Sequence, residues 1–175
     1  GPAMCAAWEA MEPVTIVAIE GWCVGGGMAL AAACDWRVAA DNAYLYVPEL
    51  KLGMNMSWQS VPRLNNLIGP ARTKQLLILA EPLEAATAAQ WGLVDYLCAP
   101  GESIEKASEL AASVAAMPPI PVRMAKRAVN MSATALDNAV SFMDADQFLL
   151  AQGTDDAVEG PLAFFEKRAP VFRGN

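Results

Sequence analysis

The chain has 175 residues, 55% of them hydrophobic and 18% charged, with a formal net charge of −7 and no histidine. A chain of this length forms one domain with its own core, and its acidity repels phosphate backbones, so we expect no nucleic-acid partner. The lack of histidine excludes Ser-His-Asp and Cys-His catalytic arrangements and argues against a zinc or other metal site.

The first half of the chain alternates strand and helix signals. VTIVAIEG is β-branched and apolar, as a buried strand is, and alanine-rich residues follow a glycine turn. In chain order the sequence predicts a helix over 4–11, a strand over 14–21, a turn at 25–27, a helix over 28–34, a short strand from Asp35, a turn at 41–42 and an extended segment ending at Pro48.

From Ser57 onward the chain is mostly helical. Gly69 and Pro82 separate helices, and Thr154 with two following aspartates is a good helix N-terminus. The sequence predicts helices over 57–66, 70–79 and 84–90, a strand over 93–98, then helices over 103–117, 121–131, 135–152 and from 154 to near 168. A strand-rich part therefore precedes a helical tail.

The cysteines indicate a reducing, cytoplasmic location. They have no C-x-x-C spacing and are expected to be small buried hydrophobic residues, and the N-terminus has no basic segment of a secretory signal. They are Cys5, Cys23, Cys34 and Cys98. No membrane span is expected, because Glu20, Asp35 and Arg37 interrupt the richest apolar region.

The stretch GWCVGGGMALAAACDWR, residues 21–37, places three glycines directly before a helix. They could form a phosphate-binding turn, a close backbone packing or an oxyanion hole. The nucleotide motifs G-x-G-x-x-G and G-x-x-x-x-G-K-[ST] are absent, which disfavours the first. In an oxyanion hole a backbone N–H at a helix N-terminus faces a carbonyl oxygen that gains negative charge, and a side chain would block its approach.

The surrounding motifs resemble the enoyl-CoA hydratase/isomerase family, also called the crotonase superfamily. The resemblance follows the chain in order and covers nearly all of it. It rests on the G-x-x-x-G-G-G turn, CDWRVA, PELKLG, LIGPARTKQLL, AAQWGLVDYL and EGPLAFFEKRAPVF.

That resemblance implies an α/β fold. Residues 1–100 would be the C-terminal part of a spiral of ββα turns, and residues 101–175 a helical region for trimerisation and for covering CoA. It also implies an acyl-CoA substrate, no separate cofactor, and a homo-oligomer, trimer or hexamer. About a third of the usual domain, with a second oxyanion donor, precedes VTIVAIEG in the family. We therefore expect a fragment, or a separate N-terminal chain that completes the site, and an exposed sheet edge.

The resemblance assigns the catalytic roles to Gly26 and Glu49. Gly26 would donate its N–H to the thioester oxygen, and Glu49 would be an acid/base. Family hydratases carry a second glutamate where this chain has Ala29. One base suffices to move a proton from carbon to carbon, which puts an isomerase slightly ahead of a hydratase. Burial beside Pro48 would raise the Glu49 pKa. The alternatives are a loop glutamate paired with Lys51 and a non-catalytic fragment or subunit.

The remaining candidates are predicted to bind substrate. Trp58 and Met54 are bulky where hydratases have small residues, so they either shape an acyl pocket or begin a buried helix. Phe164 and Lys167 match positions that reach a neighbouring subunit's CoA adenine. The complete substrate-binding set is Gly25, Trp22, Trp58, Met54, Phe164 and Lys167.

Two charged groups are expected to be structural. The sequence predicts an ion pair or cap from Asp35 and Arg37. RMAKR, residues 123–127, would be a solvated helix face rather than a phosphate site.

Overall fold

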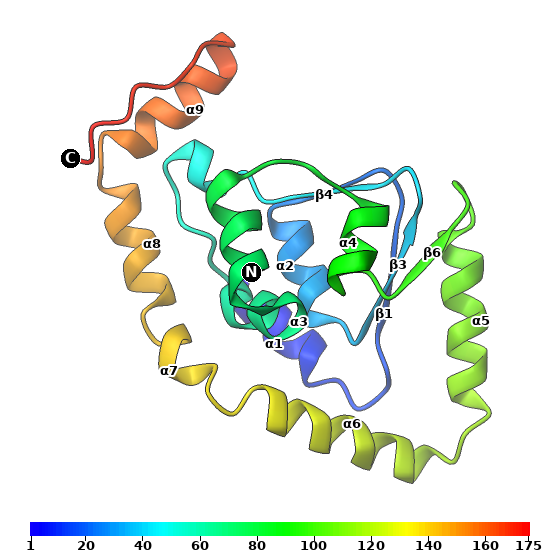
Figure 1. The fold of residues 1–175 in the computed structure, drawn as a ribbon. Coiled ribbons are helices and arrows are strands. Elements are labelled where there is room, and N and C mark those ends of the chain that lie inside the picture. Colours follow the sequence, from blue (N-terminus) through cyan, green and yellow to red (C-terminus); the bar gives the residue numbers. More distant parts are fainter.

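A computed structural model describes residues 1–175, apart from the side chain of Asn138. An α/β core comes first, and the following helices run in an arc around it (Figure 1). The elements of the core are α1 Pro2–Glu9, β1 Ile16–Ile19, β2 Trp22–Val24, α2 Gly26–Ala33, β3 Trp36–Ala40, β4 Tyr44–Tyr46, η1 Glu49–Leu52, α3 Ser60–Lys74, η2 Gln75–Leu79, β5 Leu83–Glu84, α4 Ala85–Trp91 and β6 Tyr96–Cys98.

Successive strand pairs divide between two sheets. One sheet has the order β1-β3-β6 and is parallel, with Ile16 opposite Trp36 and Val38 opposite Tyr96. The other has the order β2-β4-β5, in which β2 and β4 are parallel and β5 is antiparallel. In the first two turns the first strand, β1 or β3, joins one sheet and the second strand, β2 or β4, joins the other, with α2 between the turns. In the third turn β5 joins the second sheet and β6, after α4, joins the first. This is the ββα spiral that the resemblance implies.

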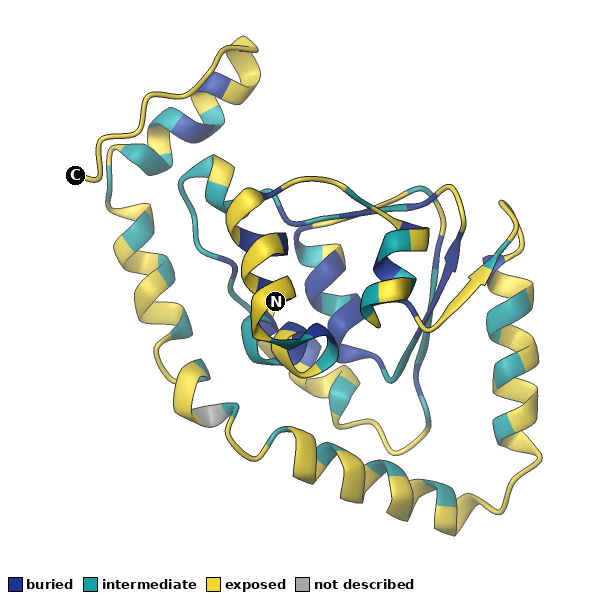
Figure 2. Ribbon diagram, in the orientation of Figure 1, coloured by how far each residue is buried: buried dark blue, intermediate teal, exposed yellow. Residues whose placement is uncertain are grey.

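The core gathers around α2, as Figure 2 shows. Its alanines and Met28 are buried, and the small side chains let neighbouring elements approach closely. Four of the five residues of β3 are buried, because this central strand is paired on both edges and covered on both faces.

Short elements and boundaries depart from the sequence prediction. α2 begins at Gly26 instead of Met28, so Gly25 alone forms the turn, with φ 53°. β2 and β5 were not foreseen, since two or three residues are too few to show a strand period. The break at Gly69, with φ 74° and ψ 166°, confirms the predicted boundary between two helical segments.

The single helix predicted over 135–152 is wrong. The chain instead forms α7 Asn138–Ser141 and α8 Asp144–Gln152, and residues 134–137 form a turn. A turn at residues 142–143 separates these two helices, and the Thr134 hydroxyl donates to the Asn130 carbonyl where the preceding helix ends. The break lets the tail bend around the core. The other tail helices are α5 Ser103–Ala115, α6 Pro119–Ala133 and α9 Asp156–Glu166.

Arg37 is buried and joins the end of α2 to the rest of the core. Its guanidinium pairs with the Asp95 carboxylate at 2.7 Å and donates to the carbonyls of Cys34 and Leu93. Burial lowers the Arg37 pKa, and the charge of Asp95 opposes this effect. The predicted cap is therefore confirmed, but the ion-pair partner is Asp95 and not Asp35.

Asp35 fastens the tail to the core through a different cation. Its carboxylate pairs with Lys126 of α6 at 2.7 Å and accepts the hydroxyl of Thr15. Arg123, one turn earlier, pairs with Glu12 at 3.3 Å. The predicted solvated face of RMAKR is confirmed for four of its five residues, which are exposed, but Lys126 is nearly buried.

No helix within the described residues is long and apolar enough to cross a membrane. The described side chains also form no cluster of three or more histidine, cysteine, aspartate or glutamate residues suited to a metal ion.

Helix α9 packs on η1 through two glycines. A Cβ at Gly160 would lie 2.5 Å from the backbone carbon of Leu52, and a Cβ at Gly53 would collide with the Asp156 carbonyl. Gly53 also has φ 69°. This close backbone packing joins the C-terminal helix to the segment that carries Glu49.

We expect Gly160→Ala to weaken this packing by about 1–3 kcal/mol, because backbone atoms cannot yield to the added methyl group. Urea unfolding and limited proteolysis of the α8–α9 region measure the effect. Gly153→Ala is the matched control, since its Cβ would meet nothing closer than 3.4 Å. Equal stability of the two variants would contradict the importance of this contact.

Candidate active site

The N-terminus of α2 is where the predicted catalytic residues meet. The Gly25 N–H donates to the Tyr46 carbonyl at 2.9 Å, and the Ala29 N–H donates to the Gly25 carbonyl at 3.0 Å. The N–H groups of a helix's first turn have no partner within that helix. Those of Gly26, Gly27 and Met28 therefore lie at the positive end of the α2 dipole.

Glu49 stands against Gly25. A Cβ at Gly25 would lie 2.8 Å from Oε1 of Glu49, so the carboxylate and the glycine backbone are in direct contact. Positive φ and this contact both require glycine here. The Glu49 backbone is held by Met54, whose N–H donates to its carbonyl at 2.9 Å.

The environment of Glu49 suits a proton carrier. Its Oε2 is buried and has no hydrogen-bond partner among the described residues. Burial raises the pKa of this carboxyl, and a backbone hydrogen bond only partly opposes the change. A raised pKa brings a carboxylate closer to the pH at which it can both accept and return a proton.

Trp58 covers the next glycine. A Cβ at Gly26 would lie 2.7 Å from Cη2 and Cζ3 of the indole. Glu49 therefore borders Gly25, and Trp58 borders the adjacent Gly26. The contacts of both glycines agree with close packing, one interpretation of the triplet. The first-turn N–H groups of α2 also leave the oxyanion-hole interpretation open.

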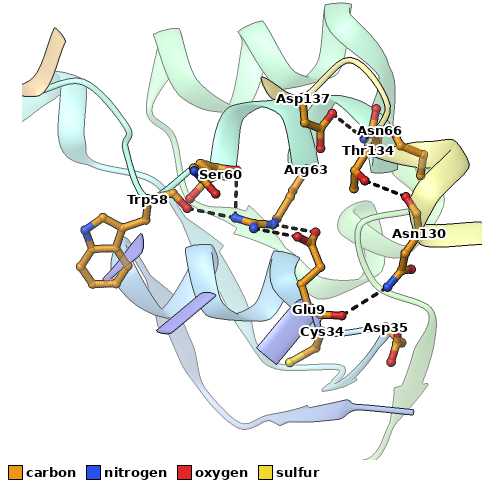
Figure 3. A network of polar contacts seen from close by, with 12 residues as sticks. Glu9, Cys34, Asp35, Trp58, Ser60, Arg63, Asn66, Asn130, Thr134 and Asp137 are labelled. Atoms are coloured by element: carbon orange, nitrogen blue, oxygen red, sulfur yellow. Dashed lines mark hydrogen bonds and ion pairs between the residues drawn. The ribbon is translucent and has the colours of Figure 1, made fainter. Parts of the chain in front are cut away.

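Trp58 and Gln59 have unusual backbone conformations. Their φ angles are 61° and 58°, a region that costs a non-glycine residue about 1–2 kcal/mol. The Arg63 guanidinium donates to both of their carbonyl oxygens at 3.0 Å and to the Glu9 carboxylate at 2.9 and 3.0 Å. Figure 3 shows the Trp58 carbonyl directed at Arg63 and the indole directed away.

The network of Figure 3 continues into the tail. The Asn130 side chain donates to the Glu9 carbonyl at 3.3 Å, and Asn66 donates to the Asp137 carboxylate at 3.3 Å. Sequence reasoning missed the part played by Glu9 and Arg63. The one available signal was a lone arginine within the apolar segment SVPRL.

Trp22 lies on β2, opposite Tyr44 of β4. The residue is 60% exposed, and its ring stacks on Tyr44 at a centroid distance of 4.9 Å, with Tyr46 at its edge. Burial, and to a lesser degree the charge of Glu49, raises the Tyr46 pKa. The Trp22 cluster thus adjoins the site through Tyr46.

Phe164 and Lys167 lie on α9 and at its end. Phe164 is 69% exposed and contacts Phe165 edge to face, and Lys167 ends the helix with φ 55°. They share the helix that packs on η1 of the same chain. Their role toward a neighbouring subunit stays a prediction.

The match that decides the family covers almost the whole chain: the model of enoyl-CoA hydratase/isomerase matches residues 4–175. The chain belongs to this family. The crotonyl-CoA hydratase of Syntrophomonas wolfei subsp. wolfei is 39% identical over 165 residues, 94% of this chain and 63% of that protein. The carnitinyl-CoA dehydratase of Escherichia coli is 32% identical over 168 residues, 94% of this chain and 64% of that protein.

Solved structures of the enoyl-CoA hydratase/isomerase family confirm the fold. An enoyl-CoA hydratase from Mycobacterium avium subsp. paratuberculosis has a TM-score of 0.91 at 25% identity, covering 97% of this chain and 69% of that chain. A carnitinyl-CoA hydratase from Mycobacterium avium has a TM-score of 0.89 at 30% identity, covering 97% and 67%. The chain spans less than two thirds of the length of the two sequence relatives.

Proposed function

We propose that this protein transforms an unsaturated acyl-CoA thioester by stabilising its enolate at the N-terminus of α2. The Gly26 N–H polarises the thioester oxygen, helped by the helix dipole. Glu49 moves the proton. The contact of Glu49 with Gly25 carries the proposal. Through this contact a carboxylate of raised pKa lies beside the residue that precedes the Gly26 N–H donor.

The favoured reaction is isomerisation of a 3-enoyl to a 2-enoyl thioester. The Glu49 carboxylate takes a proton from the α-carbon, and the electron pair passes to the thioester oxygen as the enolate forms. Glu49 then returns the proton to the γ-carbon while the double bond moves into conjugation. Ala29 is 1% exposed and carries no acid/base group, which fits a reaction that needs one carboxylate.

Hydration of a 2-enoyl thioester is the second candidate. The similarity to a crotonyl-CoA hydratase and a carnitinyl-CoA dehydratase favours it. It requires water to be activated beside Glu49, where the Trp58 indole already borders Gly26. This crowding places hydration behind isomerisation.

The proposed function also includes an oligomeric state and a cellular location. The site works with no cofactor other than the CoA of its substrate, in a cytoplasmic homo-oligomer. A trimer or hexamer would cover exposed apolar residues of the tail helices, among them Ile120, Met124 and Leu149. A separate N-terminal chain that completes the site remains part of the proposal.

We expect the full-length protein to convert 3-enoyl-CoA esters at least about tenfold faster than it hydrates 2-enoyl-CoA esters, because only one carboxylate is available. Ultraviolet absorbance follows the conjugated 2-enoyl product, and mass spectrometry detects the 3-hydroxyacyl product. Faster hydration would make the hydratase the correct assignment, and no turnover of either ester would support a non-catalytic subunit.

A further inference from the structure

The Trp58–Gln59 segment is fixed from several sides. Arg63 binds the carbonyl oxygens of both residues, and the Gln59 N–H donates to Asp144 of α8 at 3.3 Å. The Ser60 hydroxyl donates to the Ser57 carbonyl at 2.6 Å and closes the turn. A conformation that is unfavourable by itself persists only where its surroundings determine it, and such segments gather at functional sites.

Arg63 itself is held by Glu9. The guanidinium is 6% exposed and uses two nitrogens for the carboxylate and a third for the two carbonyls. This planar fork is specific to arginine, since a lysine ammonium cannot hold both partners in the same geometry. The Glu9–Arg63 pair therefore determines where the Trp58 backbone lies.

Helix α1 is linked to Trp58 at both of its ends, directly at one and through Arg63 at the other. Glu9 ends the helix and acts on Trp58 through Arg63, while Gly1 precedes it and lies directly against the indole. The opposite contact of the indole is Gly26. The ring is thus held between α1 and the N-terminus of α2.

We propose that Trp58 limits the size of the acyl group beside Gly26 and that the Glu9–Arg63 pair positions it. This inference rests on the proposed function and names its substrate class: thioesters with short acyl chains. An acyl carbon near the Gly26 N–H lies between the Glu49 carboxylate and the edge of the indole. A long chain meets the ring, because Arg63 leaves the Trp58 backbone no freedom to withdraw it.

Binding of saturated esters tests this inference without turnover. Isothermal titration calorimetry gives the ratio of dissociation constants for butyryl-CoA and decanoyl-CoA on the full-length protein. We expect a preference for butyryl-CoA that Trp58→Ala reduces about tenfold, the scale of discrimination in an apolar pocket. Arg63→Lys should shift the ratio in the same direction.

The double variant Trp58→Ala with Arg63→Lys separates positioning from a merely structural role. If Arg63 acts through Trp58, the double variant has the same ratio as Trp58→Ala alone, whereas independent effects would add. Arg72→Lys is the matched control on α3, because Arg72 is exposed and donates to the Trp91 carbonyl, and its ratio should equal that of the wild type. Should Arg63→Lys fail to fold, Glu9→Gln replaces it.

Three outcomes overturn the inference. An unchanged ratio in Trp58→Ala shows that the indole does not limit the acyl group. Additive shifts in the double variant show that Arg63 does not act through Trp58. Failure of both esters to bind the wild type refutes the proposed function and the inference together, whereas binding with no turnover refutes only the proposed reaction.

Discussion

Glu49→Gln is expected to lower kcat on enoyl-CoA esters at least about 10²-fold in the full-length protein, the usual contribution of a general base. The side chain keeps its size and loses its ability to carry the proton. Binding of a saturated acyl-CoA should persist, because the first-turn N–H groups of α2 remain. Steady-state kinetics and calorimetry measure the two effects separately.

The same variant should be as stable as the wild type, or more stable, at neutral pH. Burial raises the Glu49 pKa, so ionisation of this carboxyl lowers the free energy of unfolding. The loss grows as pH rises through the folded-state pKa. Below the ordinary glutamate pKa both proteins are neutral at residue 49 and their stabilities converge. As the pH is lowered, the kcat of the wild type should fall at a pKa above the ordinary glutamate value, because protonated Glu49 cannot act as a base.

Glu84→Gln on β5 is the control, since Glu84 is exposed. Its kcat should match that of the wild type. Retention of wild-type turnover by Glu49→Gln would show that Glu49 is not the base.

Arg37→Met is expected to lower the free energy of unfolding by about 3–5 kcal/mol, the usual cost of removing one partner of a buried ion pair. Methionine roughly keeps the volume, so the loss comes from the unpaired Asp95 and from carbonyls that lose their donor. Urea denaturation measures it. The end of α2 is the part of the core most affected.

Arg123→Met is the comparison for Arg37→Met. The Arg123–Glu12 pair is exposed, at 54% and 74%, and such pairs contribute about 0–1 kcal/mol. If the two variants lost similar stability, Arg37 would not have the structural role assigned to it.

The local elements of the core could be predicted because local signals are strong there. VTIVAIEG contains β1, and the alanine-rich residues after the glycines form α2. Gly69 marks the helix break, and the motif position of Glu49 identified the carboxylate that lies against Gly25, next to Gly26. The single helix over 135–152 failed because the curvature of the tail depends on the core that it surrounds.

The sequence by itself determined the family, the order of most elements and the residues of the proposed reaction, since these follow from local composition and motif. Only the tertiary structure decided the partners. It paired Arg37 with Asp95 and Arg63 with Glu9, and placed the Trp58 indole on Gly26. Such partners are 32 to 58 residues apart in the chain, and only packing determines which distant groups meet.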